Sequence, residues 1–335
     1  MKLVLFNFEM DQKSQALAFA IDWINEIAKN IDKLYVVSLR CKEYKVRHNV
    51  EVICIKQDKK NKLQTILSIW KALKYIHKKD RVDGYFVHMA HYFVPIIYPF
   101  AKFYNQKIVL WYAHKSVTIS LKIANFFTDI VVTSTKQGYR IKTNKLKILS
   151  QGIDTNKFNF KNQHKNIKNI AVIGRISRIK NVKEIVESFT KLDNDDLKLY
   201  IVGDIMGDKT YLKEIREVAN NNVVFVGSIP FNRLHEFYKN IDLTINLSDT
   251  GSLDKVIVES MAMGIPVITS NESAKELFKH LDNKGVFLID KSQLKEKLNF
   301  ILNHQDLINN DSLRKEIIHN HSLNNLIKKI IGEFK

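Results

Sequence analysis

The chain has 335 residues, of which 45% are hydrophobic and 26% charged, and these values exclude both a single small module and a disordered chain. Two cysteines, Cys41 and Cys54, cannot build a disulfide scaffold, and no CxxC pair or Cys/His cluster offers a zinc site, so we expect a reducing cytosol. The formal net charge is +18, of which residues 1–166 carry +17, from 29 basic and 12 acidic side chains. Unless a general lysine bias explains it, this charge indicates an anionic partner such as a membrane surface, a phosphorylated acceptor or nucleic acid.

Apolar runs typical of strands alternate with helical periodicity along the chain, as in a mostly parallel sheet with crossover helices. The opening residues favour a first strand over a signal peptide, because acidic Glu9 follows a short apolar stretch. The uncharged segment 84–101 is nearly long enough to span a membrane, but glycine, proline and histidine interrupt it, so we expect a strand and an aromatic-rich helix. In this half the predicted strands are 2–8, 33–39, 50–55, 85–89, 107–113, 129–134 and 145–150.

The strand pattern then restarts after a polar, aperiodic connection at 152–168. We therefore expect two doubly wound α/β domains facing a cleft, residues 1–166 and 167–315, with ligands bound beyond the carboxyl ends of the strands. Residues 316–335 form a helical segment that could pack back on the first domain. The predicted strands of the second half are 169–174, 198–203, 223–227, 243–248, 266–270 and 285–289.

The glycines exclude two nucleotide-binding classes. None precedes Gly84, so the first strand-to-helix turn lacks GxGxxG, and GxxxxGK[ST] occurs nowhere. Gly174, Gly203 and Gly227 each end a predicted strand, where a missing Cβ allows the backbone to approach a ligand closely. Turn geometry alone is the alternative explanation.

Basic residues follow the first of these glycines. Arg175 and Lys180 stand between a strand end and a helix start, where a guanidinium and an ammonium could hold a diphosphate without a metal. For Arg178 and Lys183 we favour a solvated turn.

Residues 249–270 are the most informative segment. Thr250, Gly251 and Ser252 could present backbone N–H groups to phosphate or sugar oxygens. A turn capped by Ser252 is the alternative interpretation of the same residues. Glu259 stands among apolar residues, so its carboxylate should be buried and needs donors. Ribose hydroxyls would supply them, or Lys255 one turn earlier.

Taken together, these residues resemble the family 4 retaining glycosyltransferases of the GT-B fold over essentially the whole chain. Gly174, Arg175 and Lys180 match a G-R-x4-K pattern, and Glu259 followed by 264–267 (GIPV) matches the second part of an E-x7-E pattern. The resemblance implies that Arg175 and Lys180 bind the donor diphosphate and that Glu259 binds the ribose.

Two further segments carry the resemblance. His114, followed by Lys115 and a serine, looks like the family's strand-His element beside the donor sugar, although a capping or core histidine is the alternative. The segment 152–158 is similar to the family's interdomain signature.

The chain departs from the family pattern at two places. Gly251 replaces the first glutamate of E-x7-E, which touches the donor sugar in the family, and Asp249 or Asp254 could substitute for it. The glycine-rich loop after the first strand is replaced by 9–15 (EMDQKSQ). The donor sugar and the acceptor side therefore do not follow from the resemblance.

The resulting prediction is a cytoplasmic retaining glycosyltransferase that uses a nucleotide-sugar and a glycan or lipid-linked acceptor, with no cofactor and no metal. The DxD at Asp193 and Asp195 is interpreted as a solvated turn rather than as a metal site. The alternatives are a nucleotide-sugar epimerase of the same fold and a non-catalytic binder of membranes or nucleic acid, although no nucleic-acid motif accompanies the charge.

A peripheral contact with an anionic inner membrane surface is also expected. No acidic residue lies between Asp83 and Asp129, and lysines alternate there with aromatic residues, which favours helix 91–104 as the contact unless it simply packs into the core. The lysines assigned to membrane or acceptor are Lys102, Lys107 and Lys115.

Overall fold

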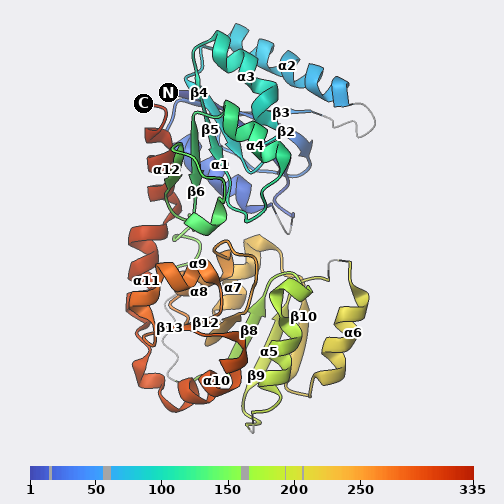
Figure 1. Cartoon of the computed structure of the whole chain (residues 1–335), viewed down its shortest axis with the longest axis vertical. Coiled ribbons are helices and arrows are strands. Elements are labelled where there is room, and N and C mark those ends of the chain that lie inside the picture. Colours follow the sequence, from blue (N-terminus) through green and yellow to red (C-terminus); the bar gives the residue numbers. More distant parts are fainter. Residues whose placement is uncertain (15–16, 56–61, 160–165, 193, 206) are drawn as a thin grey trace. The chain divides into compact units, whose positions relative to one another are not determined.

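The structure is a computed structural model, and it describes residues 1–14, 17–55, 62–159, 166–192, 194–205 and 207–335. The chain forms two compact units, one of Met1–Gly152 with Leu323–Lys335 and one of Ile153–Ser322 (Figure 1). Each unit contains a parallel sheet with helices, so the predicted α/β class is confirmed. The units change at 152/153 and 322/323, whereas the sequence placed its divisions at 166 and 315.

The sheet of the first unit has the order β3-β2-β1-β4-β5-β6-β7, and its pairs are parallel. The order reverses at β1, where Val4 lies opposite Tyr35 on one side and Tyr85 on the other. Such a reversal is typical of doubly wound sheets. The strands are β1 (Lys2–Met10), β2 (Lys33–Cys41), β3 (Val50–Cys54), β4 (Gly84–His88), β5 (Lys107–Trp111), β6 (Ile130–Thr133) and β7 (Leu146–Ile148).

Helices cover both faces of this sheet. Successive strand residues point to opposite sides, and the apolar side chains on each side pack against helices. Val4 and Phe6 share a buried core with α2 (Lys62–Lys79), α3 (Phe93–Phe103) and α4 (Ile119–Phe127). Leu3 and Leu5 share another core with α1 (Phe19–Lys29) and α12 (Leu323–Gly332), which pack against each other. The last helix of the chain thus completes the core of the first unit.

The uncharged segment 84–101 forms β4 and most of α3, as predicted. Phe93, Val94 and Ile97 on α3 are buried in the core. Among the described residues, no helix is both long and apolar enough to cross a bilayer.

The sheet of the second unit has the order β10-β9-β8-β11-β12-β13. Its strands are β8 (Asn169–Ile173), β9 (Lys198–Val202), β10 (Val223–Gly227), β11 (Leu243–Asn246), β12 (Val267–Thr269) and β13 (Val286–Leu288). One face packs on α5 (Val182–Phe189), α6 (Lys209–Val218) and α10 (Leu294–Asn303). The other packs on α7 (Leu234–Tyr238), α8 (Lys255–Ala262), α9 (Glu272–Leu277) and α11 (Asn310–Glu316). Every strand predicted from the sequence is present, several of them shorter than predicted.

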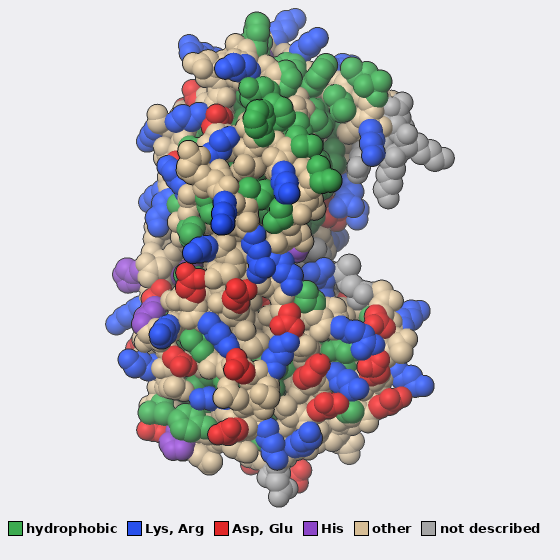
Figure 2. Space-filling model, in the orientation of Figure 1, with side chains coloured by type: hydrophobic (Ala, Val, Ile, Leu, Met, Phe, Trp, Pro, Cys, Tyr) green, Lys and Arg blue, Asp and Glu red, His purple; other side chains and the backbone are tan. Residues whose placement is uncertain are grey.

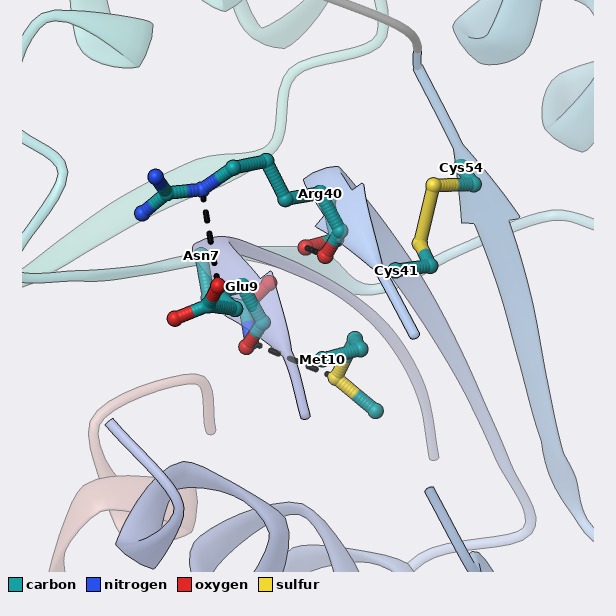
Figure 3. Close-up of a disulfide and its surroundings, with 7 residues drawn as sticks. Asn7, Glu9, Met10, Arg40, Cys41 and Cys54 are labelled. Atoms are coloured by element: carbon teal, nitrogen blue, oxygen red, sulfur yellow. Dashed lines mark hydrogen bonds and ion pairs between the residues drawn. A yellow bond between two sulfur atoms is a disulfide. The ribbon is translucent and has the colours of Figure 1, made fainter. Parts of the chain in front are cut away.

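The two cysteines, which were expected to build no disulfide scaffold, form a single disulfide (Figure 3). Cys41 ends β2 and Cys54 ends β3, and their Cα atoms are 6.0 Å apart. Because β2 and β3 are neighbours in a parallel sheet, their carboxyl ends meet at one edge. The sequence shows only a separation of 13 residues and cannot reveal this pairing.

Candidate active site

The carboxyl ends of β8, β9 and β10 bring three predicted glycines together. The N–H of Gly174 donates to Val202 O at 2.9 Å, and the N–H of Gly203 donates to Gly227 O at 2.8 Å. A Cβ on Gly203 would lie 1.9 Å from Gly174 O, so the neighbouring backbone requires this glycine. At Gly174 and Gly227 a Cβ would meet no described atom within 4 Å, which leaves open space for a ligand at this edge.

Lys180 lies at this edge and is paired with an acid. Its Nζ donates to Asp254 Oδ2 at 2.6 Å, and its side chain is only 15% exposed. Asp254 also accepts from Asn246 at 2.9 Å and from the Thr250 hydroxyl at 3.0 Å. Burial disfavours the charge of this carboxylate, but the charge of Lys180 and the hydrogen bonds from Lys180 and Asn246 outweigh burial and lower the pKa of Asp254 below its usual range. A small cavity beside this pair is lined by Gly174, Arg175, Lys180 and Asn246, among others.

The other cations of the segment lie in different surroundings, and Lys183 is on α5 rather than in the expected solvated turn. Arg175 follows Gly174 directly and is exposed at the cavity. Arg178 instead lies over the Tyr211 ring and pairs with Asp208 at 3.0 Å and with Glu214. Arg178 is therefore engaged on the outer surface of α6 and is distinct from the Lys180 pair.

In the loop before α8, one of the backbone N–H groups expected to face a ligand already has a partner within the loop. The N–H of Thr250 donates to the Ser248 hydroxyl at 3.3 Å, so this group is not simply available to a ligand. Gly251, at φ +73°, and Ser252 are held through their carbonyls, which accept from Ser273 and Asn271 respectively.

The amino end of α8 retains the character of an anion site. Asp254 occupies the N-cap position, but its side chain bonds to Lys180, Asn246 and Thr250 rather than to the first N–H groups of the helix. Uncapped N–H groups and the positive end of the helix dipole attract phosphate oxygens. Together with Lys180, this end of α8 can bind an anionic group.

Glu259 is buried in the second turn of α8, as predicted. It is 3% exposed, and the Tyr238 hydroxyl donates to its Oε2 at 3.2 Å. Burial raises the pKa of Glu259 to about 7, while the charge of Lys255 opposes the rise. The sequence did not single out Tyr238, which belongs to a short amphipathic helix without a motif.

The two acids considered as substitutes for a glutamate at Gly251 are both engaged. Asp254 holds Lys180, and Asp249 accepts from Asn181 at 3.0 Å and from Lys291.

In the first unit, His114 follows β5 on an exposed loop. The backbone N–H of His114 donates to Gly138 O at 2.8 Å. The ring Nδ1 accepts from the backbone N–H of Ser116 at 3.1 Å. This arrangement assigns the proton of a neutral ring to Nε2. Exposure contradicts the alternative of a core histidine.

The lysines predicted in this unit do not form one group. Lys102 is exposed at the end of α3, and Lys107 begins β5, where its ammonium donates to Glu333 O at 3.1 Å. Lys115 is half-buried beside His114.

In the segment that replaces the family's glycine-rich loop, Glu9 accepts a hydrogen bond from the Ser14 hydroxyl at 2.9 Å. Glu9 also pairs with Arg40 at 3.6 Å (Figure 3).

The structure describes only part of the DxD segment, which the sequence analysis interpreted as a turn rather than a metal site. Asp193 of the DxD lies outside the described residues, and Asp195 is exposed. Over the described ranges, no three His, Cys, Asp or Glu side chains are grouped to hold a metal ion.

Comparisons with known proteins agree with this fold. A family described as "Glycosyl transferases group 1" matches residues 153–321. HepE from Anabaena, solved with UDP and glucose, is 16% identical with a TM-score of 0.78, covering 99% of each chain. A glycosyltransferase from Rickettsia africae is 19% identical with a TM-score of 0.79, covering 100% of this chain and 97% of its own.

Sucrose-phosphate synthase from Thermosynechococcus elongatus is 13% identical with a TM-score of 0.80, covering 99% of this chain and 98% of its own. These likenesses confirm the predicted GT-B fold. No match was found among curated proteins.

Proposed function

Because the chain belongs to the group 1 glycosyl transferases, we propose that it moves a sugar from a nucleotide-sugar donor to an acceptor with retention of the anomeric configuration. The observation that carries this proposal is the group formed by Lys180, Arg175 and the uncapped amino end of α8 at the open edge beside Gly174. This group suits a diphosphate, which is the leaving group of such a reaction.

The chemistry assigned to these residues is electrostatic. As the bond between the sugar and the diphosphate breaks, negative charge gathers on the leaving phosphate oxygens. A guanidinium, an ammonium and helix N–H groups placed beside those oxygens stabilise that charge more in the transition state than in the ground state. This arrangement supplies the positive charge that a metal ion provides in other transferases, so we propose that the reaction is metal-independent.

We assign Glu259 to the ribose hydroxyls, because an ionised carboxylate accepts two hydroxyl hydrogen bonds. Tyr238 holds this carboxylate in place. His114 is assigned to the donor sugar on the family resemblance, with its Nε2–H as the donor.

A uridine nucleotide is the first donor to test, since HepE was solved with UDP and with UDP-glucose. For the acceptor we propose a glycan or lipid-linked precursor at the cytoplasmic face of a membrane. WaaG, a glycosyltransferase involved in lipopolysaccharide biosynthesis, supports this class at 13% identity and a TM-score of 0.71.

The deciding experiment is a donor screen. Thermal shift identifies the nucleotide that binds, and release of nucleoside diphosphate from a panel of its sugars, with lipid-linked and soluble acceptors, identifies the reaction. EDTA should leave the rate of transfer unchanged. A strict magnesium requirement would overturn the assigned role of the cations, and epimerised donor with no transfer would overturn the proposed function.

A further inference from the structure

The helices α2, α3 and α4 cover one face of the first unit's sheet and expose apolar side chains to solvent. On α4, Ile119 is 79% exposed, Ile123 45% and Phe126 75%. These residues follow i, i+4, i+7 spacing, so they form one stripe, and it lies opposite the face that buries Leu121 and Ala124. An outward apolar stripe of this kind is uncommon on a soluble surface and marks an interaction site.

The same spacing recurs on α2. Leu63, Leu67 and Trp70 are exposed by 65%, 54% and 36% and also follow i, i+4, i+7. The core residues of α2, including Ile69 and Leu73, lie on another side of the helix.

Ring contacts through α3 join the two stripes into one surface. The Trp70 indole donates to Ile96 O at 2.9 Å and contacts the Phe100 ring, whereas the Tyr98 ring contacts Phe127 next to the α4 stripe. Phe103, at the end of α3, adds a ring that is 81% exposed. Figure 2 shows hydrophobic side chains gathered over these helices with basic side chains among them. We call this surface the α2–α4 face.

The charge of the α2–α4 face is entirely positive over the segment that forms α3 and α4, because no acidic residue lies between Asp83 and Asp129. Lys102 and Lys122 are exposed directly beside Phe103 and Ile123. The whole first unit carries 29 basic and 12 acidic side chains, whereas the second carries 24 and 23.

We propose that the α2–α4 face docks on a bilayer surface rich in anionic phospholipid. Apolar side chains enter the headgroup boundary while the lysines pair with phosphates, which is how amphipathic surfaces bind membranes. A second copy of this chain fits poorly, since a two-fold interface would set the same lysines against each other. Nucleic acid would leave the aliphatic side chains of both stripes in water. The contact therefore involves the outer side of three helices, rather than helix 91–104 alone as the sequence suggested.

The experiment measures co-sedimentation of the full chain with vesicles of phosphatidylcholine alone and of phosphatidylcholine with phosphatidylglycerol. We expect binding to the anionic vesicles at least tenfold stronger than to the neutral ones, and release at high salt. Ile119→Gln/Ile123→Gln/Phe126→Gln and Lys102→Glu/Lys122→Glu should each weaken binding at least tenfold.

Matched controls come from the second unit. Leu307→Gln/Ile318→Gln replaces side chains that are also exposed, by 39% and 38%, and Lys239→Glu/Lys295→Glu makes the same change of charge. Both controls should bind vesicles like the wild type, and thermal unfolding shows that every variant is folded.

Three results would overturn the proposal: no binding to either vesicle, equal binding to both, or binding that the α4 variant leaves intact. Self-association that the α4 variant abolishes, without vesicle binding, would assign the face to a second copy. Because the assay needs neither donor nor turnover, its failure is distinct from failure of the proposed transferase activity.

Discussion

The ammonium of Lys180 lies 2.6 Å from Oδ2 of Asp254, so the cation assigned to the donor diphosphate is already neutralised by an acid of the same site. A diphosphate placed there would feel the attraction of Lys180 and the repulsion of Asp254. We expect Asp254→Asn to tighten binding of the nucleoside diphosphate roughly tenfold, because one nearby negative charge disappears while the side-chain shape is kept. Isothermal titration measures the change. Weaker binding would show that the carboxylate serves mainly to position the lysine.

Loss of Arg175 or Lys180 should slow transfer far more than loss of the neighbouring Arg178. Arg175→Ala and Lys180→Ala should each leave the fold intact and slow transfer by roughly 10² to 10³, the usual cost of one lost charge-stabilising donor. Arg178→Ala is the matched control, because Arg178 pairs with Asp208 and Glu214 on the surface. Steady-state rates decide the matter, and near-normal turnover in both site variants would remove the diphosphate assignment.

Nucleotide binding should depend on pH through Glu259. Burial raises the pKa of Glu259 to about 7, and the ionised form is the one that accepts ribose hydroxyls. Affinity should therefore rise between pH 6 and pH 8, with proton release on binding. Calorimetry in two buffers of different ionisation enthalpy measures that release. Glu259→Gln retains the titration of the nucleotide phosphates and removes the contribution of the protein, so equal proton release in both proteins would contradict the ribose assignment.

The same residue should shape the stability of the free protein. Between the ordinary glutamate value of 4.5 and about 7, the unfolded chain loses a proton that the folded protein keeps. Stability should therefore decrease as pH rises through this window, by up to about 3 kcal/mol. Denaturant unfolding at pH 5 and pH 8 should show this decrease in the wild type and a smaller one in Glu259→Gln. An identical decrease in both would place its cause elsewhere.

The Cys41–Cys54 disulfide closes a short loop between neighbouring strands. Reduction should lower the free energy of unfolding by up to about 3 kcal/mol, because the reduced unfolded chain gains conformational freedom. Cys41→Ser/Cys54→Ser should not respond to reductant. Thiol titration in denaturant without reductant should find no free thiol. Two titratable thiols would contradict the disulfide.

The strands and the glycine positions could be predicted because they depend on local pattern. Alternating apolar runs specify strands, and Gly174, Gly203 and Gly227 each followed such a run. Tyr238 and the pairing of Lys180 with Asp254 could not be predicted, because each joins segments that only the folded sheet brings together. The apolar stripe of α4 was not singled out from the sequence, because its exposure depends on which face of the helix meets the sheet.

The packing of α12 against α1 has a consequence for synthesis. Leu326 and Ile330 fill the core beneath Trp23 and Leu5, yet the ribosome makes them only after all of residues 153–322. Domains usually fold in the order in which they are made. Here the first unit must wait while the second is completed, with one side of its sheet covered by α1 but not by α12, and exposed apolar surface of this kind is a binding site for chaperones. Translation that stops before residue 323 would release a chain whose second unit is whole and whose first unit is unfinished.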